Sequence, residues 1–259
     1  MLKSIQQIFA LALIDLRRRH VDTRLGFAWL LIQPTMTFGI FYLVTVYGFK
    51  MGATAGAAPY FAVLFCGLLP WMTLSDSINN AATSLRSRRH LLTDNAVPPV
   101  TIVLASVLSP VMLHLLLLAV VLLIFVAGGV PMTAAGIAIV YYYLCLMALC
   151  VAVGLLVAPL ATRNADVAQI ISTIVLVWFW ASPIIWVPST LPESALPYFR
   201  LNPFFYIVEG YRGALLLNDP FPAPSAFDAA YWLTVLVLAG LGYGLLRQSA
   251  PALREWLHR

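Results

Sequence analysis

Charged residues are scarce in this chain. Only 10% of its 259 residues are Asp, Glu, Lys or Arg, whereas about 25% is usual for a soluble domain. Hydrophobic residues make up 62%, and a soluble core of that size would need a polar shell that the sequence does not supply. With no internal repeat or linker, the composition predicts an integral membrane protein whose single domain spans residues 1–259.

The chain also lacks sequence motifs for binding ATP or a metal ion. Its two lysines, Lys3 and Lys50, do not lie in a phosphate-binding loop of the form G-x-x-x-x-G-K-[ST]. No His and Cys residues have metal-site spacing, and the three cysteines fall inside apolar runs, where they are expected as small buried side chains. We therefore predict no catalytic residue, metal or cofactor in this chain, so that any energy must come from a partner.

Charge-free runs recur at the length of a membrane span. A span needs about 20 mostly apolar residues, and such runs follow one another from residue 27 to residue 246. The run 95–162 is long enough for two spans and contains Gly-Gly-Val-Pro near its middle. We therefore predict an all-α fold with six transmembrane helices, at 27–49, 58–84, 100–127, 133–160, 167–187 and 229–246.

Basic residues lie almost entirely on one side of the predicted spans. Of the 15 Lys and Arg, only Lys50, Arg200 and Arg212 fall on the other side. Cytoplasmic loops carry such an excess. Both termini, including the tail 247–259, are therefore predicted to be cytoplasmic. The net charge of +5 marks topology and gives no reason to expect a nucleic-acid partner.

The first 24 residues predict a helix that lies flat on the membrane. Apolar residues repeat at helical spacing from Ile5 to Leu16, and most polar residues lie off that stripe. A helix of this pattern can rest in the lipid headgroup region; a plain cytoplasmic extension is the alternative. The basic cluster follows the apolar positions, so a cleaved signal peptide is not predicted.

Two kinds of residue inside the predicted spans suggest a passage through the membrane. Asp76 and Asn79 share one face of the second span, and such a face must meet protein or water. Aromatic residues gather in spans one and five, where their faces could stack on sugar rings. Helix packing is the alternative for both sets, and the polar face could also lie beyond a span that already ends near Leu74. For His114, packing is the expected role.

The segment 188–228 is rich in proline yet apolar between Leu201 and Leu217. Glu209 and Arg212 are three residues apart, a spacing that can pair them on one helix face. We predict short helices that re-enter the membrane, where non-helical backbone must be shielded by protein. An amphipathic surface loop is the alternative.

Four stretches, in order along almost the whole chain, resemble the membrane permeases of ATP-binding-cassette (ABC) exporters for O-antigen, teichoic acid and capsule. The first has a basic cluster, Leu-Gly, Trp and Pro entering span one, and the second has Pro-Trp and a basic loop. The third has Arg-x-x-Asp before aromatics, and the fourth has Asn-Pro and a later Arg. They read RRRHVDTRLGFAWLLIQP, LPWMTLSDSINNAATSLRSRRHLLTDNAVPP, ATRNADVAQIISTIVLVWFWASPIIW and LNPFFYIVEGYRGALL.

The resemblance implies a transporter of two permease copies and two ATPase subunits in a bacterial inner membrane. ATP and Mg²⁺ would bind the ATPase, and a polysaccharide on undecaprenyl diphosphate, O-antigen by preference, would pass between the permeases. Rival hypotheses are a permease for another lipid-linked or small amphipathic cargo, a membrane-embedded lipid-phosphate enzyme, and a passive channel.

The resemblance also assigns roles to residues. The channel would be lined by Phe38, Phe41, Tyr42, Asp76, Asn79, Trp178, Phe179 and Trp180. The carrier's diphosphate would meet Arg18, Arg19 and Arg24. The coupling helix, seated in the ATPase, would comprise Arg86, Arg88, Arg89, His90 and Asp94. The outer gate would include Asn202, Pro203, Glu209 and Arg212.

Overall fold

The computed structural model describes residues 2–18, 25–50, 54–55, 58–93, 97–127, 134–162, 164–217 and 225–257. Within these residues the fold is helical, apart from the two-residue strands β1 (Thr54–Ala55) and β2 (Ala58–Pro59), which pair antiparallel. Five helices are long and apolar enough to cross a membrane. They are Trp29–Gly48 (α2, Trp29–Leu43, and a following π-helical turn), α3 (Tyr60–Ser87), α5 (Pro99–Ala127), α6 (Ala138–Thr162) and Ala226–Ser249 of α10 (Ala226–Leu257).

The fifth predicted span is shorter than the sequence indicated. We expected a helix over 167–187, but α7 runs over Ala165–Trp180, 16 residues. At 1.5 Å per residue it is about 24 Å long, less than the roughly 30 Å hydrocarbon core. Pro183 explains the early end, because the residue before a proline is disfavoured in the α conformation. The prediction of six full spans is therefore confirmed for five.

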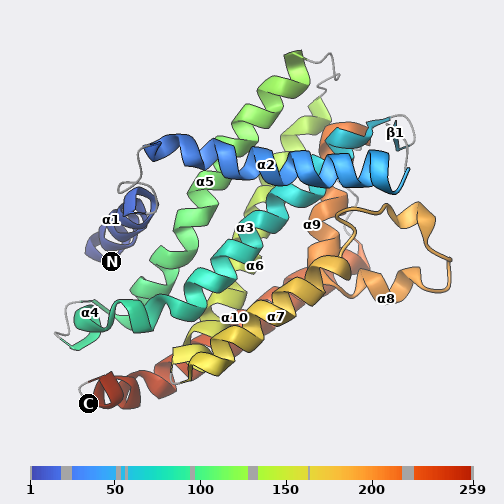
Figure 1. Cartoon of the computed structure of the whole chain (residues 1–259). Coiled ribbons are helices and arrows are strands. Elements are labelled where there is room, and N and C mark those ends of the chain that lie inside the picture. Colours follow the sequence, from blue (N-terminus) through green and yellow to red (C-terminus); the bar gives the residue numbers. More distant parts are fainter. Residues whose placement is uncertain are drawn as a thin grey trace.

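Figure 1 shows α3 and α6 in the middle of the bundle, with α5, α7 and α10 packed around them and α2 crossing over α3. We call the end with α1 (Leu2–Arg18), α4 (Arg89–Thr93) and the last turns of α10 the terminal end. We call the end with the β1–β2 hairpin and α8 (Leu196–Arg200) the hairpin end. The side chains of α3 and α6 are mostly buried, whereas those of α2 and α10 are mostly exposed.

Local sequence signals explain where two helices begin. Asn164 precedes α7 and its side chain accepts a hydrogen bond from the backbone N–H of Asp166, which is the expected N-cap geometry. Asn202 does the same for the N–H of Phe204 at the start of α9 (Pro203–Arg212). Pro203 occupies the first helical position, where its missing N–H costs nothing.

The segment between α7 and α10 contains short helices. A 3₁₀ turn (Pro188–Thr190) precedes α8, and α9 continues into a π-helical turn, Gly213–Leu217. Most of α9 is buried: both Phe204 and Ile207 are fully enclosed. The segment is thus part of the packed fold rather than a solvated loop.

The N-terminal residues form the predicted amphipathic helix. α1 packs along the start of α5, with Ala12 completely buried. Three members of its apolar stripe, Ile5, Phe9 and Leu13, are nevertheless exposed. Its apolar surface is therefore only partly used by the contact with α5.

Candidate functional site

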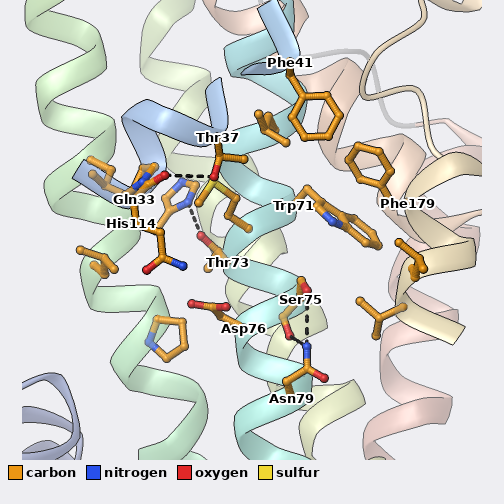
Figure 2. A pocket seen from close by; sticks show the side chains of 18 of the residues that line it. Gln33, Thr37, Phe41, Trp71, Thr73, Ser75, Asp76, Asn79, His114 and Phe179 are labelled. Atoms are coloured by element: carbon orange, nitrogen blue, oxygen red, sulfur yellow. Dashed lines mark hydrogen bonds between the residues drawn. The ribbon is translucent and has the colours of Figure 1, made fainter. Parts of the chain in front are cut away.

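A candidate site is a cavity of about 670 Å³ between α2, α3, α5 and α7. α3 provides Trp71, Thr73, Ser75, Asp76 and Asn79 to its wall, and Figure 2 shows these side chains following one another down the helix. The wall changes in character along the same line. Aromatic rings gather toward the hairpin end, and hydroxyl, amide and carboxyl groups gather toward the terminal end.

α3 and α7 run antiparallel along this cavity, and two contacts fix their register. The Ser172 hydroxyl on α7 donates a hydrogen bond to Asn79 Oδ1, at 2.8 Å. Two turns further along α7, the ring of Phe179 meets the ring of Trp71 with centroids 5.6 Å apart. This register places the polar part of α7 beside the polar part of α3 and aromatic beside aromatic.

The polar end of the cavity is held in shape by hydrogen bonds within and between helices. Asn79 Nδ2 donates to the carbonyl of Ser75, at 2.9 Å. Across the cavity, the Thr37 hydroxyl on α2 donates to the carbonyl of Gln33, at 3.0 Å. Asp76 adds a carboxyl group to the same wall. Hydroxyl, amide and carboxyl groups are the partners that sugar hydroxyls bind.

The aromatic end is a cluster of rings from three helices. Phe41 on α2 meets Phe179 at 5.4 Å between centroids, and Trp180 on α7 meets Phe179 edge-on at 5.4 Å. Trp71 on α3 completes the group. These rings pack edge-on or tilted, geometries typical of stable aromatic contacts.

The structure brings five of the eight predicted channel residues to the cavity. They are Phe41, Asp76, Asn79, Phe179 and Trp180. Phe38, Tyr42 and Trp178 do not line it. Phe38 instead packs against Phe65 on α3, with ring centroids 3.9 Å apart, and the indole N–H of Trp178 donates to Asn202 Oδ1, at 2.8 Å.

Trp71 is the main cavity residue that sequence reasoning did not single out. It lies four residues before Ser75 and eight before Asn79, so all three share one helix face. Helical spacing from Asn79, followed two turns toward the start of α3, is therefore the sequence signal that points to Trp71. The next residue, Asn80, instead turns to α5 and donates to the carbonyl of Ser106, at 3.4 Å.

His114 has the packing role that was expected. It is fully buried, its Nδ1 lies 2.7 Å from the Thr73 hydroxyl, and its Nε2 lies 2.8 Å from the Tyr211 hydroxyl. The ring also stacks on Tyr143 with centroids 5.6 Å apart. His114 thus joins the cavity wall on α3 and α5 to α9 by a continuous set of hydrogen bonds.

Arg212 forms a buried clasp at the hairpin end. It is 5% exposed and pairs with Glu209 at 3.0 Å, as the spacing of three predicted. Its Nη2 also donates to the carbonyls of Ile184 and Trp186, both at 3.3 Å. The guanidinium therefore holds residues 184–186, which follow α7, against α9.

Asn202 and Tyr60 hold the same connection from two other sides. Asn202 Nδ2 donates to the hydroxyl of Ser182, at 2.9 Å, while its Oδ1 receives the Trp178 indole and caps α9. The Tyr60 hydroxyl on α3 donates to the carbonyl of Ile185, at 2.7 Å. Asn202 and Arg212, two of the predicted gate residues, thus bind different parts of the segment that follows α7. Glu209 pairs with Arg212 on α9, and Pro203 begins that helix.

At the terminal end, the predicted coupling residues divide into two groups. Arg86 donates to the carbonyl of Thr162 at the end of α6, at 3.0 Å. Arg88 forms an ion pair with Asp15 of α1 and donates to the carbonyl of Ile102. These two arginines therefore hold helices together.

The second group forms the first turn of α4. Arg89 and His90 are exposed there. Asp94, the remaining predicted coupling residue, lies outside the described residues. So do Arg19 and Arg24, two of the predicted diphosphate contacts, and only the backbone of the third, Arg18, is described.

Comparisons with known proteins agree with this architecture. The ABC-2 type transporter family matches residues 6–216. The O-antigen export system permease protein RfbA of Myxococcus xanthus is 25% identical over 226 residues, covering 86% of this chain and 85% of that protein. The polysialic acid transport protein KpsM of Escherichia coli is 21% identical over 242 residues, covering 93% of each chain. An RfbA of Klebsiella pneumoniae is 23% identical over 209 residues, covering 76% of this chain and 75% of that protein.

The family match spans most of the amphipathic helix α1, the four cavity helices and α9 with its Arg212 clasp, and it ends before α10. This chain therefore belongs to the ABC-2 type transporter family, multi-pass membrane permeases that lack an ATPase site of their own and pair with a separate ATPase subunit.

Proposed function

We propose that this chain is the permease of an exporter for a cell-surface polysaccharide, by preference O-antigen on undecaprenyl diphosphate, across the bacterial inner membrane. The observation that carries the proposal is the cavity between α2, α3, α5 and α7, with rings at one end and hydrogen-bonding groups at the other. The names of the RfbA and KpsM relatives, an O-antigen permease and a polysialic acid transport protein, support the same class of cargo.

The two ends of the cavity suit the two surfaces of a sugar. A pyranose ring has apolar C–H faces that can lie on Phe41, Trp71 and Phe179. Its hydroxyls can exchange hydrogen bonds with Asn79 and Ser172, which already bond to each other in this structure. Because each contact is weak alone, successive sugar units can replace one another along the wall without being trapped.

A second copy of the chain would complete the passage. Polar groups within a membrane face protein or water rather than lipid, yet α2, which covers the polar wall, has few buried side chains of its own. Symmetric pairing of two copies would enclose the cavities of both. We therefore propose a dimer of permeases, served by two ATPase subunits that bind ATP and Mg²⁺.

The terminal end would face the cytoplasm and the ATPase. Arg86, Arg88 and Arg89 lie there, as expected for a cytoplasmic excess of basic residues. α4 would serve as the coupling helix and α1 would lie in the headgroup region, with its exposed apolar residues toward the acyl chains. Arg18, Arg19 and Arg24 would attract the anionic diphosphate of the carrier.

The hairpin end would then be the outer side, and the segment with α8 and α9 its gate. Re-entrant backbone in a membrane must be shielded by protein, and the network of Asn202, Tyr60 and Arg212 provides that shielding for residues 182–186. Export would require this network to open or to move as a unit.

Two measurements test the proposed function. Affinity purification of the full chain in mild detergent should recover a soluble ATPase subunit. Deletion of the gene should remove a polysaccharide from the cell surface. An intact surface glycan would favour another cargo, and bond-making or bond-breaking activity of the purified chain alone would favour a lipid-phosphate enzyme.

We expect Arg89→Glu to weaken association with the ATPase by about tenfold, equivalent to about 1.4 kcal/mol. Arg89 is exposed at the start of α4, so charge reversal there changes the partner surface without breaking an internal bond. The measurement is the dissociation constant of the detergent-purified permease and ATPase. Arg200→Glu, an exposed change at the hairpin end, is the matched control. If the Arg89→Glu permease bound the ATPase with unchanged affinity, α4 would not be part of the coupling surface.

We expect the double change Phe41→Ala and Phe179→Ala to slow export about tenfold while ATP hydrolysis stays detectable. Aromatic contacts contribute roughly 0.5–1.5 kcal/mol each beyond area burial, and two rings that guide the sugar would be lost. Export is measured as surface polysaccharide per cell after induction. Tyr243→Ala, an exposed aromatic on α10, is the control. Normal export in the double variant would show that Phe41 and Phe179 only pack within the fold and do not guide the sugar.

A further inference from the structure

A chain of three buried side chains connects the cavity to α9. Thr73 on α3 and His114 on α5 both border the cavity, and a dashed line in Figure 2 joins them. On its other side, the His114 ring reaches the hydroxyl of Tyr211 on α9. We propose that His114 is a positioning residue that links the cavity to α9, so that a sugar bound beside Thr73 loosens the outer gate. The inference rests on the proposed function and concerns the regulation of that same site.

One arrangement of hydrogens satisfies all three side chains. The Tyr211 hydroxyl donates to His114 Nε2, at 2.8 Å, and the His114 Nδ1–H group donates to the Thr73 oxygen, at 2.7 Å. The Thr73 hydroxyl donates in turn to the carbonyl of Leu69, at 3.2 Å. A neutral imidazole offers one donor and one acceptor, as this order requires. We assign the hydrogens in this way because no donor in the chain is then left unpaired.

The Thr73 oxygen is the point at which a sugar could act on this chain. A sugar hydroxyl that donates to this oxygen competes with the Nδ1–H group of His114. Because His114 is fully buried, a donor that loses Thr73 cannot turn to bulk water, and an unpaired buried donor is unfavourable. Hydrogen bonds in a chain also strengthen one another, so weakening the bond at Thr73 weakens the bond at Tyr211.

The other end of the chain is covalently joined to the gate. Tyr211 is fully buried and precedes Arg212, whose guanidinium binds the carbonyls of Ile184 and Trp186. α9 packs against α3 and α6, and the bond to His114 ties it to α5 as well. A shift of Tyr211 therefore moves the backbone of Arg212 and disturbs the bonds that hold residues 184–186.

The chemistry of His114 favours this role over packing alone. α5 contains no Asp, Glu, Lys or Arg, and His114 is its only histidine. Polar side chains inside a membrane span are costly and commonly mark functional positions. An apolar contact between α5 and α9 would avoid that cost, but it would not respond to a sugar hydroxyl.

A native cysteine can report whether the gate is open. Cys66 on α3 is 2% exposed and lies within electrostatic range of Arg212. Its neighbour Gly67 packs on the segment that Arg212 holds, since a Cβ atom there would lie 2.9 Å from Ile184 Cα. Movement of that segment should expose Cys66 to a water-soluble maleimide. Cys150 on α6 is fully buried and monitors general unfolding.

The first measurement uses the permease–ATPase complex in lipid nanodiscs and the polysaccharide isolated from the surface of the same cells. Alkylation of each cysteine is followed by mass spectrometry, with and without saturating polysaccharide. We expect polysaccharide to speed alkylation of Cys66 at least tenfold and to leave Cys150 unchanged. An unchanged rate at Cys66, or an equal rise at Cys150, overturns the inference.

Two isosteric variants remove the ends of the chain one at a time. Thr73→Val and Tyr211→Phe each keep the shape of the side chain and delete its hydroxyl. We expect each to raise the rate at Cys66 about tenfold without polysaccharide and to reduce the effect of polysaccharide to less than twofold. Because both act through His114, the double variant should be no faster than either single variant. Independent losses would instead multiply, and that result contradicts the proposal.

Thr162→Val and Tyr231→Phe are the matched controls. Each removes a buried hydroxyl that donates to a carbonyl outside the chain, at Ala158 and Cys145 respectively. The response of Cys66 to polysaccharide should be the same in both controls as in the unchanged permease. Loss of the response in the controls would show that any buried hydroxyl has this effect, and the special role of the chain would be disproved.

His114→Asn and His114→Gln separate positioning from the filling of space. The Asn amide lies where Nδ1 lies and can still bind Thr73, whereas the Gln amide reaches as far as Nε2 and can still bind Tyr211. Each variant keeps one bond of the chain, so each should lose the response of Cys66 to polysaccharide even where its unfolding temperature is normal. A response that persists in either folded variant shows that His114 does not link the two sites.

Failure of the inference and failure of the proposed function give different results. The polysaccharide could bind the complex, as measured by tryptophan fluorescence, and be lost from the cell surface when the gene is deleted. If Cys66 then shows no response, the inference alone falls. If the polysaccharide neither binds the complex nor depends on the gene, the proposed function and the inference fall together.

Discussion

Replacing Arg212 with methionine should abolish export and destabilise the permease by about 3–5 kcal/mol, the range for breaking a buried pair by removing one partner. Methionine keeps much of the apolar stem but removes all the guanidinium donors. The carbonyls of Ile184 and Trp186 would then lose their partner at a site where Arg212 is only 5% exposed. Each buried polar group left unpaired costs roughly 1–3 kcal/mol.

The consequence should be an outer gate that no longer closes. We expect a lower unfolding temperature in detergent and nucleotide-independent leakage of a small dye from proteoliposomes. Leakage separates a gate from an ordinary structural contact, because a merely destabilised permease would lose export without becoming permeable. Tight vesicles with Arg212→Met would therefore contradict the gate assignment even if the protein were less stable.

Two further substitutions calibrate the Arg212 result. Arg212→Lys keeps the positive charge, but a single ammonium cannot reproduce the fork that reaches two carbonyls and Glu209 at once. It should give an intermediate effect. Glu209→Gln should cost less, because the Glu209 side chain is 36% exposed and can be solvated when its partner is lost.

Gly242→Leu should prevent α10 from docking on α6. A Cβ atom at Gly242 would lie 2.5 Å from the backbone nitrogen of Leu156 and 2.7 Å from the carbonyl carbon of Leu155. Backbone atoms of a helix cannot move aside as a flexible side chain can. The helices would have to separate, so the loss should exceed the 1–3 kcal/mol typical of overpacking.

Gly240→Leu is the matched control on the same helix, two residues away. A Cβ atom at Gly240 would meet no atom within 4 Å, and leucine has a higher helix propensity than glycine. The comparison uses the yield of monodisperse protein on size-exclusion chromatography and its unfolding temperature. We expect near-normal values for Gly240→Leu and a large loss for Gly242→Leu. Equal behaviour would show that the close approach of α6 and α10 is not required.

Part of the candidate site could be predicted because its signals are local. Asp76 and Asn79 share a helix face by spacing alone, and the pairing of Glu209 with Arg212 follows from a separation of three residues. The start of α9 follows from Asn202 and Pro203. The same kind of local signal, repeated along the chain, predicted the family and the positions of five spans.

Other parts of the site depend on residues that are far apart in the sequence. Trp178 was predicted to line the channel because it is aromatic, but its indole N–H donates a hydrogen bond to Asn202, 24 positions later. Arg88 was predicted to belong to the coupling surface, yet it forms an ion pair with Asp15, 73 positions earlier. The partners of His114 lie 41 and 97 positions away. Spacing rules cannot reach such pairs.

The sequence by itself determined that this is a membrane protein and that most of its basic residues lie on one side of the spans. It also determined that the chain belongs to a family of permeases without an ATPase site of their own. Hydrophobic run length, charge counts and short motifs are properties of neighbouring residues, so they can be read without knowledge of the tertiary structure. Only the tertiary structure decided which faces of α2, α3, α5 and α7 meet, which aromatic rings border the cavity and where the arginines are neutralised. Those outcomes depend on helix rotation and register, which are set by packing between distant segments and not by the residues of any one helix.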